Sequence, residues 1–575
     1  MNRSIGTFFP LFFRMALLMA VTVIPPAQAF DRSSPHPNQA RSVVIARQGM
    51  VATSHPLAAQ AGLDVLKSGG TAADAAIAAN AMLGVVEPMS CGIGGDLFVI
   101  YWDAKTQKLY GLNASGRSPF GLNRQVFAEK GLPQIPTTGP LSWSVPGCVD
   151  GWRELHGRFG RKPLAEILAP AIAAAEEGEP VPEVIAGYWK GAEGSLRKWP
   201  DSAATFLVDG QRAPSVGEVM KNPRLAASLR IIAKEGPQAF YQGEIAKKIV
   251  AFSEKNGGYF SLRDFTEHKS EWVEPVSTNY RGYDVWELPP NGQGIAALEM
   301  LNILEQHDLR TLGHNSAEHL HLFLEAKKLA FADRAKFYVD PAFGALPVKE
   351  LISKEYAKKQ NARIDLHKAA EDVPAGDPKL THGDTIYLTV VDKDRNCCSF
   401  IQSNYFGFGS MVVPGDVGFA MQNRGALFAL DDKHANRLEP HKRPFHTIIP
   451  AFITKEGKPW FCFGVMGGDM QAQGHVQIVC NLVDFGMNVQ AAGDAPRASH
   501  SGSATPTGLA AEGSGQVLVE GGVSDEAVGA LRSMGHKVMR GSGGFGGYQG
   551  ILIDWKNGVL HGASESRKDG AAVGY

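Results

Sequence analysis

Residues 381–392 read THGDTIYLTVVD, and this stretch decides how the rest of the chain is interpreted. From Thr385 onward, apolar residues fall on both faces, which predicts a strand covered on both sides. A Gly-Asp pair, Gly383 and Asp384, leads directly into Thr385. Spacing alone favours Thr385 as an ordinary first residue of a strand. The other interpretation is that the chain is cut before Thr385, which then becomes a new N-terminus.

A second strand is expected directly after the first. The sequence DKDRN at 392–396 is typical of a turn, and CCSFIQSN at 397–404 predicts an antiparallel partner. Depending on where the turn centres, Thr385 lies opposite Ser403 or opposite Asn404. Directly opposed residues have Cβ atoms about 4.5–5.5 Å apart. Either register therefore brings these two residues close to the Thr385 hydroxyl.

Cutting before Thr385 would change its chemistry. A threonine hydroxyl is a poor nucleophile without a base, and an N-terminal threonine supplies that base in its own α-amine. An α-amine ordinarily has a pKa of about 8, so a useful fraction is neutral at pH 7. The expected route is attack by Thr385 Oγ on the carbonyl of Asp384, giving an ester that water then opens. Gly383 would allow the strained backbone that this attack needs.

Composition and charge set limits on the function. The chain has 575 residues, 44% hydrophobic and 20% charged, which is typical of a globular protein. Its formal net charge of −1 gives no basic field to attract nucleic acid, so no nucleic-acid partner is expected. The six cysteines lack the CxxC spacing of a metal site, and buried thiols are expected. His319 and His321 are two apart on a helix and therefore diverge, so no metal site is predicted there.

The first residues resemble an export signal. Arg3 and Arg14 precede the apolar run MALLMAVTVI, and PPAQAF follows it. This pattern predicts a signal peptide over residues 1–29, cleaved after Ala29, and an exported protein that is periplasmic or secreted. The alternative is a membrane anchor, but the run is short for a span. Stable membrane insertion is therefore not expected.

Periodicity along the chain predicts an α/β layered architecture. Residues 54–68 and 316–338 have the pattern of amphipathic helices, and the region 163–255 is mainly helical. Thr71 begins another helix with Asp74 as its capping partner. After residue 385 the pattern changes to strands, which together with the helices favours stacked layers.

Two glycine-containing stretches have plain structural interpretations. NGQGIA at 291–296 predicts a strand-to-helix turn, with anion binding at the helix start as the alternative. GSGGFGGYQG at 541–550 predicts a close-packed loop that lies near the mouth of a site.

Several motifs, in order, resemble the γ-glutamyltranspeptidase (glutathione hydrolase) family of N-terminal nucleophile hydrolases. They are GMVATSHPLAAQAGLDVLKSGGTAADAAIAA (49–79), EAKKLAFADRAKFYVDP (325–341), GDTIYLTVVDKDRN (383–396), PHKRPFHTIIP (440–450), GVMGGDMQAQGH (464–475) and KDGAAVGY (568–575). The resemblance covers nearly all of the chain after the signal sequence. Because of this resemblance, Thr385 is interpreted as a new N-terminus rather than as an ordinary first residue of a strand.

The resemblance implies an αββα sandwich made by a zymogen that cleaves itself between Asp384 and Thr385. Residues 30–384 would form a large subunit and residues 385–575 a small subunit, and both belong to one αββα domain. The implied reaction is acyl transfer from γ-glutamyl amides such as glutathione, through a Thr385 ester, to water or an amino acid. The implied partners are a small-molecule amide and the two subunits of one precursor, with no cofactor.

Four residues match the family's catalytic positions. Thr385 matches the nucleophile, and Ser403 matches a second threonine that supports it. Gly467 and Gly468 match the oxyanion-hole pair, whose backbone N–H groups would meet the developing charge; one such donor is typically worth about 3 kcal/mol.

The substrate-binding positions depart from the family. They fall on Arg117, Asn404, Tyr405, Asn423, Arg424, His446 and Thr447. Arg424 and Leu427 stand where relatives place polar or acidic groups, and a cationic Arg424 would repel an ammonium and attract a carboxylate. Arg117 lies about two positions later than the family's arginine, and Tyr405 replaces an asparagine. These changes resemble the branch that includes cephalosporin acylases.

Three functions are therefore weighed from the sequence. An exported, self-cleaving enzyme acting on γ-glutamyl compounds comes first, on family frequency. An amidase for glutaryl-type amides comes second. A non-catalytic exported binding protein with the same fold comes third, and the intact Thr385, Ser403, Gly467 and Gly468 argue against it.

Overall fold

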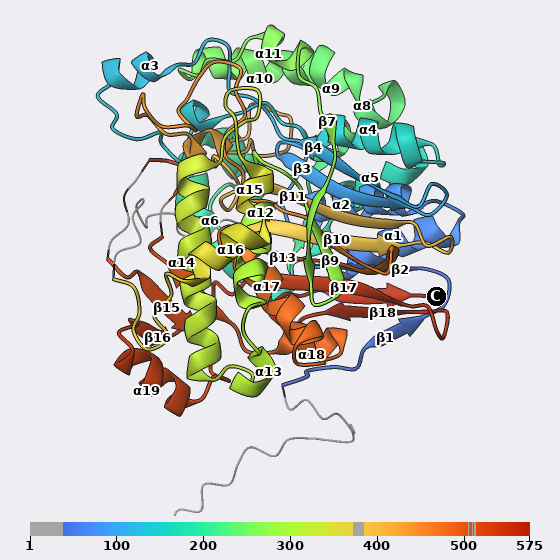
Figure 1. Ribbon diagram of the computed structural model, residues 1–575. Helices are drawn as coiled ribbons and strands as arrows, with labels where there is room; N and C mark the ends of the chain where they lie inside the picture. Colours follow the sequence, from blue (N-terminus) through green and yellow to red (C-terminus); the bar gives the residue numbers. More distant parts are fainter. Residues whose placement is uncertain (1–37, 372–383, 504, 509, 511–512) are drawn as a thin grey trace, which may run out of the picture. The chain divides into compact units, whose positions relative to one another are not determined.

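The computed structural model describes residues 38–371, 384–503, 505–508, 510 and 513–575. Two seven-stranded sheets pack face to face and helices cover their outer faces (Figure 1). The expected αββα sandwich is therefore confirmed. The predicted signal peptide and Gly383 lie outside the described residues.

The sheets interleave distant parts of the chain. The first has the order β19 (Ala571–Gly574), β2 (Met50–Thr53), β10 (Asp384–Val391), β11 (Cys397–Tyr405), β3 (Asp96–Asp103), β4 (Lys108–Ala114) and β7 (Glu271–Val273). The second has the order β1 (Val44–Ala46), β18 (Val559–Ser564), β17 (Gly547–Asp554), β13 (Lys458–Met466), β12 (Ala451–Lys455), β9 (Tyr283–Glu287) and β8 (Val276–Tyr280). Neighbouring strands in both are antiparallel.

Each sheet has its own helical cover. On the first lie α1 (Pro56–Lys67), α2 (Ala72–Val86) and α4 (Cys148–Phe159), backed by α5 (Leu164–Glu177) and α8 (Pro223–Glu235). On the second lie α12 (Gly294–Leu304), α17 (Met470–Val483) and α18 (Val489–Asp494), backed by α14 (Ala317–Phe337), α16 (Lys354–Asn361) and α19 (Asp525–Ser533).

Further helices and strands complete the fold. The helices are α3 (Arg124–Glu129), α6 (Glu183–Leu196), α7 (Pro200–Phe206), α9 (Gln238–Gln242), α10 (Glu244–Lys255), α11 (Leu262–Thr266), α13 (Leu309–Leu312) and α15 (Val348–Leu351). The strands are β5 (Glu179–Pro180), β6 (Val219–Met220), β14 (Ala498–Ser501), β15 (Gln516–Val519) and β16 (Val538–Arg540).

The β10–β11 hairpin forms as predicted, and its register answers the open question. Ile386 lies opposite Gln402, so the body of the hairpin aligns Thr385 with Ser403. A register shift between Asp384 and Ile386 then places Asp384 opposite Tyr405. This irregularity, a β-bulge, falls at Thr385 itself. β-Bulges are common beside active sites, where they change the direction of a side chain, so a bulge at the predicted nucleophile fits that role.

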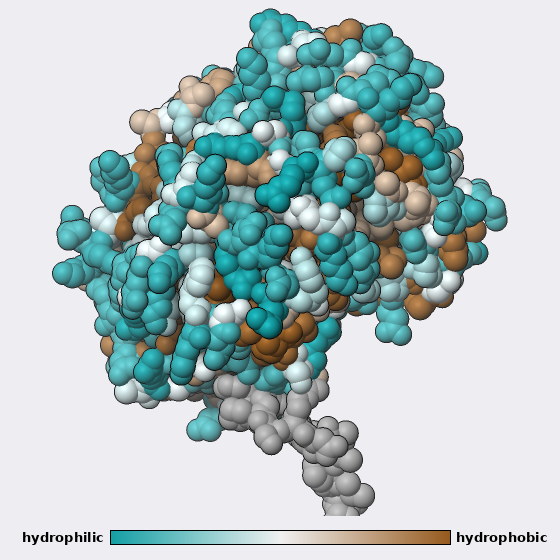
Figure 2. Space-filling model, turned by 90° about the vertical axis from the view of Figure 1, so that its right-hand side faces the viewer, coloured by the Kyte–Doolittle hydropathy of each residue, from teal (hydrophilic) through white to brown (hydrophobic). Residues whose placement is uncertain are grey.

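The apolar interior has three layers. Side chains between the sheets, among them Phe98, Tyr387, Ile401 and Phe452, form one core, and each helical layer adds another. Polar residues predominate on the face drawn in Figure 2, with apolar residues scattered among them. All six cysteines are buried and form no disulfide, as expected. In the described ranges no helix has both the length and the apolar character needed to span a bilayer.

Helix starts follow the sequence signals. Thr71 and Asp74 form a capping box at α2, which confirms the predicted pair. The buried Asp74 carboxylate also accepts the backbone N–H groups of Arg161 (3.0 Å) and Lys162 (3.2 Å). One carboxylate therefore caps α2 and fixes the loop after α4.

Replacing Asp74 with Ala should lower the melting temperature by several degrees. The change removes a cap worth about 1 kcal/mol and leaves two further N–H groups without their acceptor, at about 1–3 kcal/mol. Asp64→Ala is the matched control, because Asp64 is exposed on α1 and its carboxylate accepts from the exposed Gln60 side chain. Equal melting temperatures for the two variants, measured by calorimetry, would contradict this account.

Candidate active site

The predicted nucleophile and its supporting residue lie in hydrogen-bond contact. The Thr385 hydroxyl donates to Ser403 Oγ at 3.1 Å, and both side chains are buried. The backbone N–H of Tyr405 also donates to Ser403 Oγ, at 2.8 Å. Tyr405 has φ of +83°, which a bulky residue rarely adopts. The strained Tyr405 backbone thus orients the hydroxyl that meets Thr385.

The glycine turn lies where β13 ends and α17 begins. Gly467 and Gly468 have φ of +122° and +56°, conformations that favour glycine. A Cβ on Gly467 would stand 3.0 Å from Gly546, within the close-packed loop expected from the sequence. The turn precedes a helix N-terminus, where backbone N–H groups and the helix dipole favour negative charge.

Contacts between the sheets place this turn on the Thr385 side. Thr389 lies beside Cys462, with Oγ1 to the carbonyl oxygen at 3.4 Å, and Gly464 packs against the Tyr387 ring. Because β10 and β13 approach in this order, the end of β13 points toward the start of β10. The arrangement can serve a nucleophile and an oxyanion site at one edge of the sandwich.

Arg424 is a buried cation with unused donors. Its Nη1 donates to Thr447 Oγ1 at 2.7 Å, and its guanidinium carbon lies 4.8 Å from the centroid of the Tyr405 ring. Nε and Nη2 have no partner in the part of the chain that the structure describes. Burial lowers the pKa of Arg424 to about 10, while Asp96 and Tyr405 act in the opposite direction. It therefore stays charged at neutral pH.

His446 is hydrogen-bonded to a buried carboxylate. Its Nε2 lies 2.9 Å from Asp96 Oδ2, and the ring is fully buried. Burial lowers the pKa of His446 to about 4; nearby Arg424 adds to the effect, and the hydrogen bond to Asp96 opposes it. The imidazole is thus neutral and donates to Asp96. Of the predicted His446–Thr447 pair, Thr447 is the residue that hydrogen-bonds to Arg424 within the described part of the chain.

The side chains of Asn404 and Asn423 hydrogen-bond to backbone groups. Asn404 Nδ2 donates to the Cys91 carbonyl at 3.0 Å, and a Cβ on Gly95 would stand 2.4 Å from Asn404 Oδ1, so Asn404 points to the α2 side. Asn423 accepts the Phe406 N–H and donates to the Thr137 carbonyl. Both side chains shape the site through its loops.

Arg117 lies in a group of charged residues. Its guanidinium pairs with Asp340 (3.1 Å) and Glu271 (2.9 Å), and Arg443 also pairs with Glu271. The structure gives Arg117 no contact with Thr385, Ser403 or Arg424 among its described partners. Its charge is already matched by two carboxylates.

Three residues at the site were not singled out from the sequence. Gln293 donates to the carbonyl oxygens of Thr447 and Gly468, and Arg334 joins Gln293 to Asp469. Gln293 stands in the NGQGIA stretch, which forms the predicted turn between β9 and α12. The sequence gives a single hint of this role: a tight turn does not need a long amide side chain, yet Gln293 supplies one.

Among the residues that the structure describes, one group of side chains elsewhere has metal-ligand chemistry, namely His321, Glu325 and His536. The two ring nitrogens hydrogen-bond to each other at 2.8 Å, and Glu325 pairs with Lys328 at 2.7 Å. His319 instead accepts the Asn315 N–H, so the two histidines of α14 diverge as expected. His536 Nδ1 has no hydrogen-bond partner among the described residues, whereas Glu325 is already paired with a cation.

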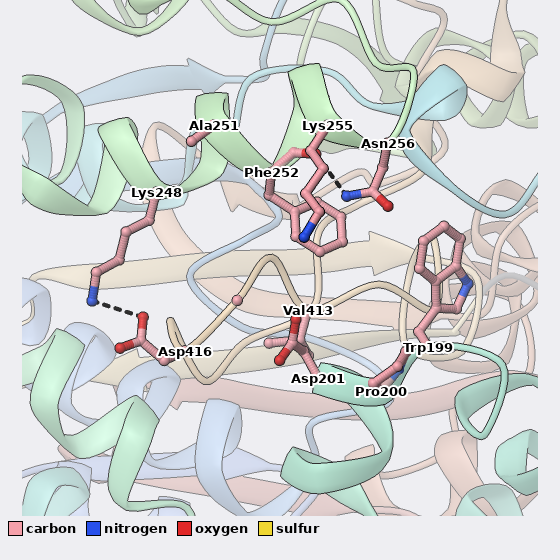
Figure 3. Close-up of a pocket in the computed structure, with 11 residues that line it drawn as sticks. Trp199, Pro200, Asp201, Lys248, Ala251, Phe252, Lys255, Asn256, Val413 and Asp416 are labelled. Carbon is pink, nitrogen blue, oxygen red and sulfur yellow. Dashed lines mark hydrogen bonds and ion pairs between the residues drawn. The ribbon is translucent and has the colours of Figure 1, made fainter.

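A separate depression of about 550 Å³ lies between α10, the start of α7 and the loop after β11 (Figure 3). Trp199 and Phe252 supply its aromatic wall, and Lys248 pairs with Asp416 at 2.7 Å across it. None of the predicted site residues lines it. It has no part in the chemistry considered below.

Acidification should destabilise the protein partly through His446. In the unfolded chain this residue takes a proton below pH 6.5, whereas in the fold it stays neutral to about pH 4. Stability is therefore lost as the pH falls through this window. Between pH 7 and pH 5 the loss is about 2 kcal/mol from this one group.

The measurement compares thermal unfolding of the wild type and His446→Gln at pH 7 and pH 5. Glutamine can still donate to Asp96 but does not titrate. The variant should lose less stability on acidification than the wild type does. Identical losses would remove His446 from the account.

Comparisons with known proteins identify the family of the chain. A sequence profile of the family described as Gamma-glutamyltranspeptidase matches residues 58–575. The "Glutathione hydrolase-like YwrD proenzyme" of Bacillus subtilis (strain 168) is 40% identical, covering 92% of this chain and 99% of its own length. The "Acylase ACY 1 proenzyme" of Pseudomonas sp. (strain SE83) is 34% identical, covering 92% and 93%.

A solved structure gives the same result. The crystal structure of cephalosporin acylase from Bacillus halodurans is similar with a TM-score of 0.86 and 44% identity, covering 95% of this chain and 99% of its own. The resemblance noted from the sequence is thus confirmed over nearly the whole chain. The chain belongs to the gamma-glutamyltranspeptidase family.

Proposed function

We propose that the chain is an exported proenzyme that cuts itself between Asp384 and Thr385 and then hydrolyses or transfers the acyl group of amides bearing a carboxylate. The observation that carries the proposal is the buried guanidinium of Arg424, with two unused donors, beside the residue that orients Ser403. An unpaired buried charge is costly, so a ligand of opposite charge is the expected partner.

The preferred substrate is a glutaryl-type amide. A γ-glutamyl group carries an α-ammonium as well as a carboxylate, and Arg424 repels the ammonium. Leu427, which is buried and apolar, offers it no counter-charge. Glutaryl-type amides therefore come before γ-glutamyl compounds, which is the reverse of the order expected from family frequency. The similarity to an acylase and to a cephalosporin acylase supports the same order.

The chemistry follows from the geometry at Thr385. In the precursor, Thr385 Oγ attacks the Asp384 carbonyl carbon, its proton passes to the departing amide nitrogen, and water opens the resulting ester. The freed α-amine then takes the Oγ proton as Oγ attacks the substrate amide. Backbone N–H groups of Gly467 and Gly468 stabilise the oxyanion, and the leaving amine receives the proton. Water or an amine releases the acyl group from Thr385.

Ser403 supports the nucleophile before and after the cut. Its Oγ accepts from Thr385 at 3.1 Å in the uncut chain. The products of cleavage are residues 30–384 and 385–575, once the proposed signal peptide 1–29 is removed. Export is supported by the sequence of that peptide.

Self-cleavage predicts two bands of about 38 and 20 kDa on a denaturing gel, in proportion to the 61.7 kDa of the whole chain. Thr385→Ala should give one uncut band and no turnover, because attacker and proton acceptor are lost together. Thr389→Ala is the matched control, since Thr389 lies on the same face of β10 and is equally buried. A cut that persists in Thr385→Ala would refute the assignment. An uncut wild type would favour the binding protein.

Arg424→Met should lower kcat/KM for a glutaryl anilide by about 10- to 150-fold, the loss of a charged hydrogen bond worth about 1.5–3 kcal/mol. Processing and thermal stability should be retained, because removing an unpaired buried charge does not weaken a fold. The wild type should prefer glutaryl over γ-glutamyl anilide. A strong γ-glutamyl preference, or an unchanged glutaryl rate in the variant, would overturn the substrate assignment.

A further inference from the structure

Gln293 has a fully used side-chain amide directly before α12. Its Nε2 donates to the carbonyl oxygen of Thr447 at 2.7 Å and to that of Gly468 at 2.9 Å. Its Oε1 accepts from Arg334 Nη1 at 2.5 Å. The side chain is fully buried. Both N–H donors and the carbonyl oxygen are therefore engaged with three different elements.

These partners fix the orientation of the amide. Turning it over would place Oε1 against two carbonyl oxygens and the NH₂ group against a guanidinium, so every contact would become repulsive. A glutamine in such a position has a single stable arrangement. It can act as a rigid spacer between the two carbonyls that it joins.

One of those carbonyls belongs to the glycine turn. The start of α17 also holds the turn, since Met470 N–H donates to the Gly467 carbonyl and Gln471 N–H to the Gly468 carbonyl. Two successive glycines at positive φ have wide conformational freedom. Gln293 adds the contact that sets the turn relative to Thr447, whose hydroxyl receives Arg424.

Arg334 anchors the other end of the spacer. It extends from α14 and pairs with both oxygens of Asp469, at 2.7 and 3.2 Å, and Asp469 directly follows Gly468. Burial would raise the pKa of Asp469, but its pairing with Arg334 lowers it, so the carboxylate stays ionised. Gln293 and Arg334 thus hold the turn through two successive residues, Gly468 and Asp469.

We propose that Gln293 is a positioning residue for the oxyanion-binding turn, holding Gly467 and Gly468 at a fixed distance from the carboxylate-binding Arg424 and Thr447. The inference rests on the proposed function, because it takes this turn as the oxyanion site. Gln293 does not touch the acyl group. Its loss therefore lowers the rate of acylation and deacylation while leaving recognition of the carboxylate in place.

The experiment compares Gln293→Met with Gln477→Met in the processed protein. Gln477 on α17 is also buried, donates to the carbonyls of Gln473 (3.1 Å) and Ala498 (2.9 Å), and accepts the Ala498 N–H (2.9 Å). It has the same hydrogen-bond pattern without a site residue as partner. A merely structural role for Gln293 would make the two variants alike.

Gln293→Met should lower kcat for a glutaryl anilide by about 10- to 100-fold, as expected for a displaced oxyanion donor. Inhibition by free glutarate, which binds at Arg424 and Thr447 without forming a tetrahedral oxyanion, should change less than threefold. Gln477→Met should keep both values. Gln293→Glu preserves shape and the acceptor for Arg334, and it should show the same loss of kcat if the methionine variant does not fold.

Each result decides the inference. A Gln293 variant with wild-type kcat, or one whose kcat and glutarate inhibition fall together, overturns it and leaves the proposed function standing. A wild type that turns over no amide overturns the proposed function, and the inference with it.

Discussion

A buried carboxylate is stable only where hydrogen-bond donors replace its lost water, and the Asp96 carboxylate has four such donors. The donors are Gly116 N (2.9 Å), Gly147 N (3.1 Å), Gln422 Nε2 (2.8 Å) and His446 Nε2 (2.9 Å). They come from four segments that are distant in sequence. Asp96 also lies directly opposite Ser403 across the sheet. One side chain therefore holds the loops around the nucleophile in place.

This anchoring leaves Arg424 as the site's unmatched charge. Asp96 acts electrostatically on Arg424, but no hydrogen bond or ion pair joins these two side chains among the described residues. Tyr405 covers one face of the guanidinium and also orients Ser403. Ligand recognition and nucleophile support are thus joined through a single strained residue.

Local patterns predicted the hairpin, the capping box of Thr71 and Asp74 and the layered architecture, because each depends on neighbours in sequence. The register at Thr385 stayed open between two choices, since a bulge combines both. Sequence matching placed Arg117 and His446 at the substrate, but each finds carboxylate partners that only tertiary packing supplies. Gln293 was missed for the same reason, because its three partners come from distant segments.

The first sheet alternates between the two proposed fragments: β2 lies between β19 and β10, and β11 pairs with β3. Separating the fragments would expose strand edges on both and open the core between the sheets. If the peptide bond before residue 385 is cut, the two fragments consequently have no interface along which they could separate without breaking the first sheet. Mature protein should denature as one cooperative body, and neither half made alone would have a complete sheet to fold into.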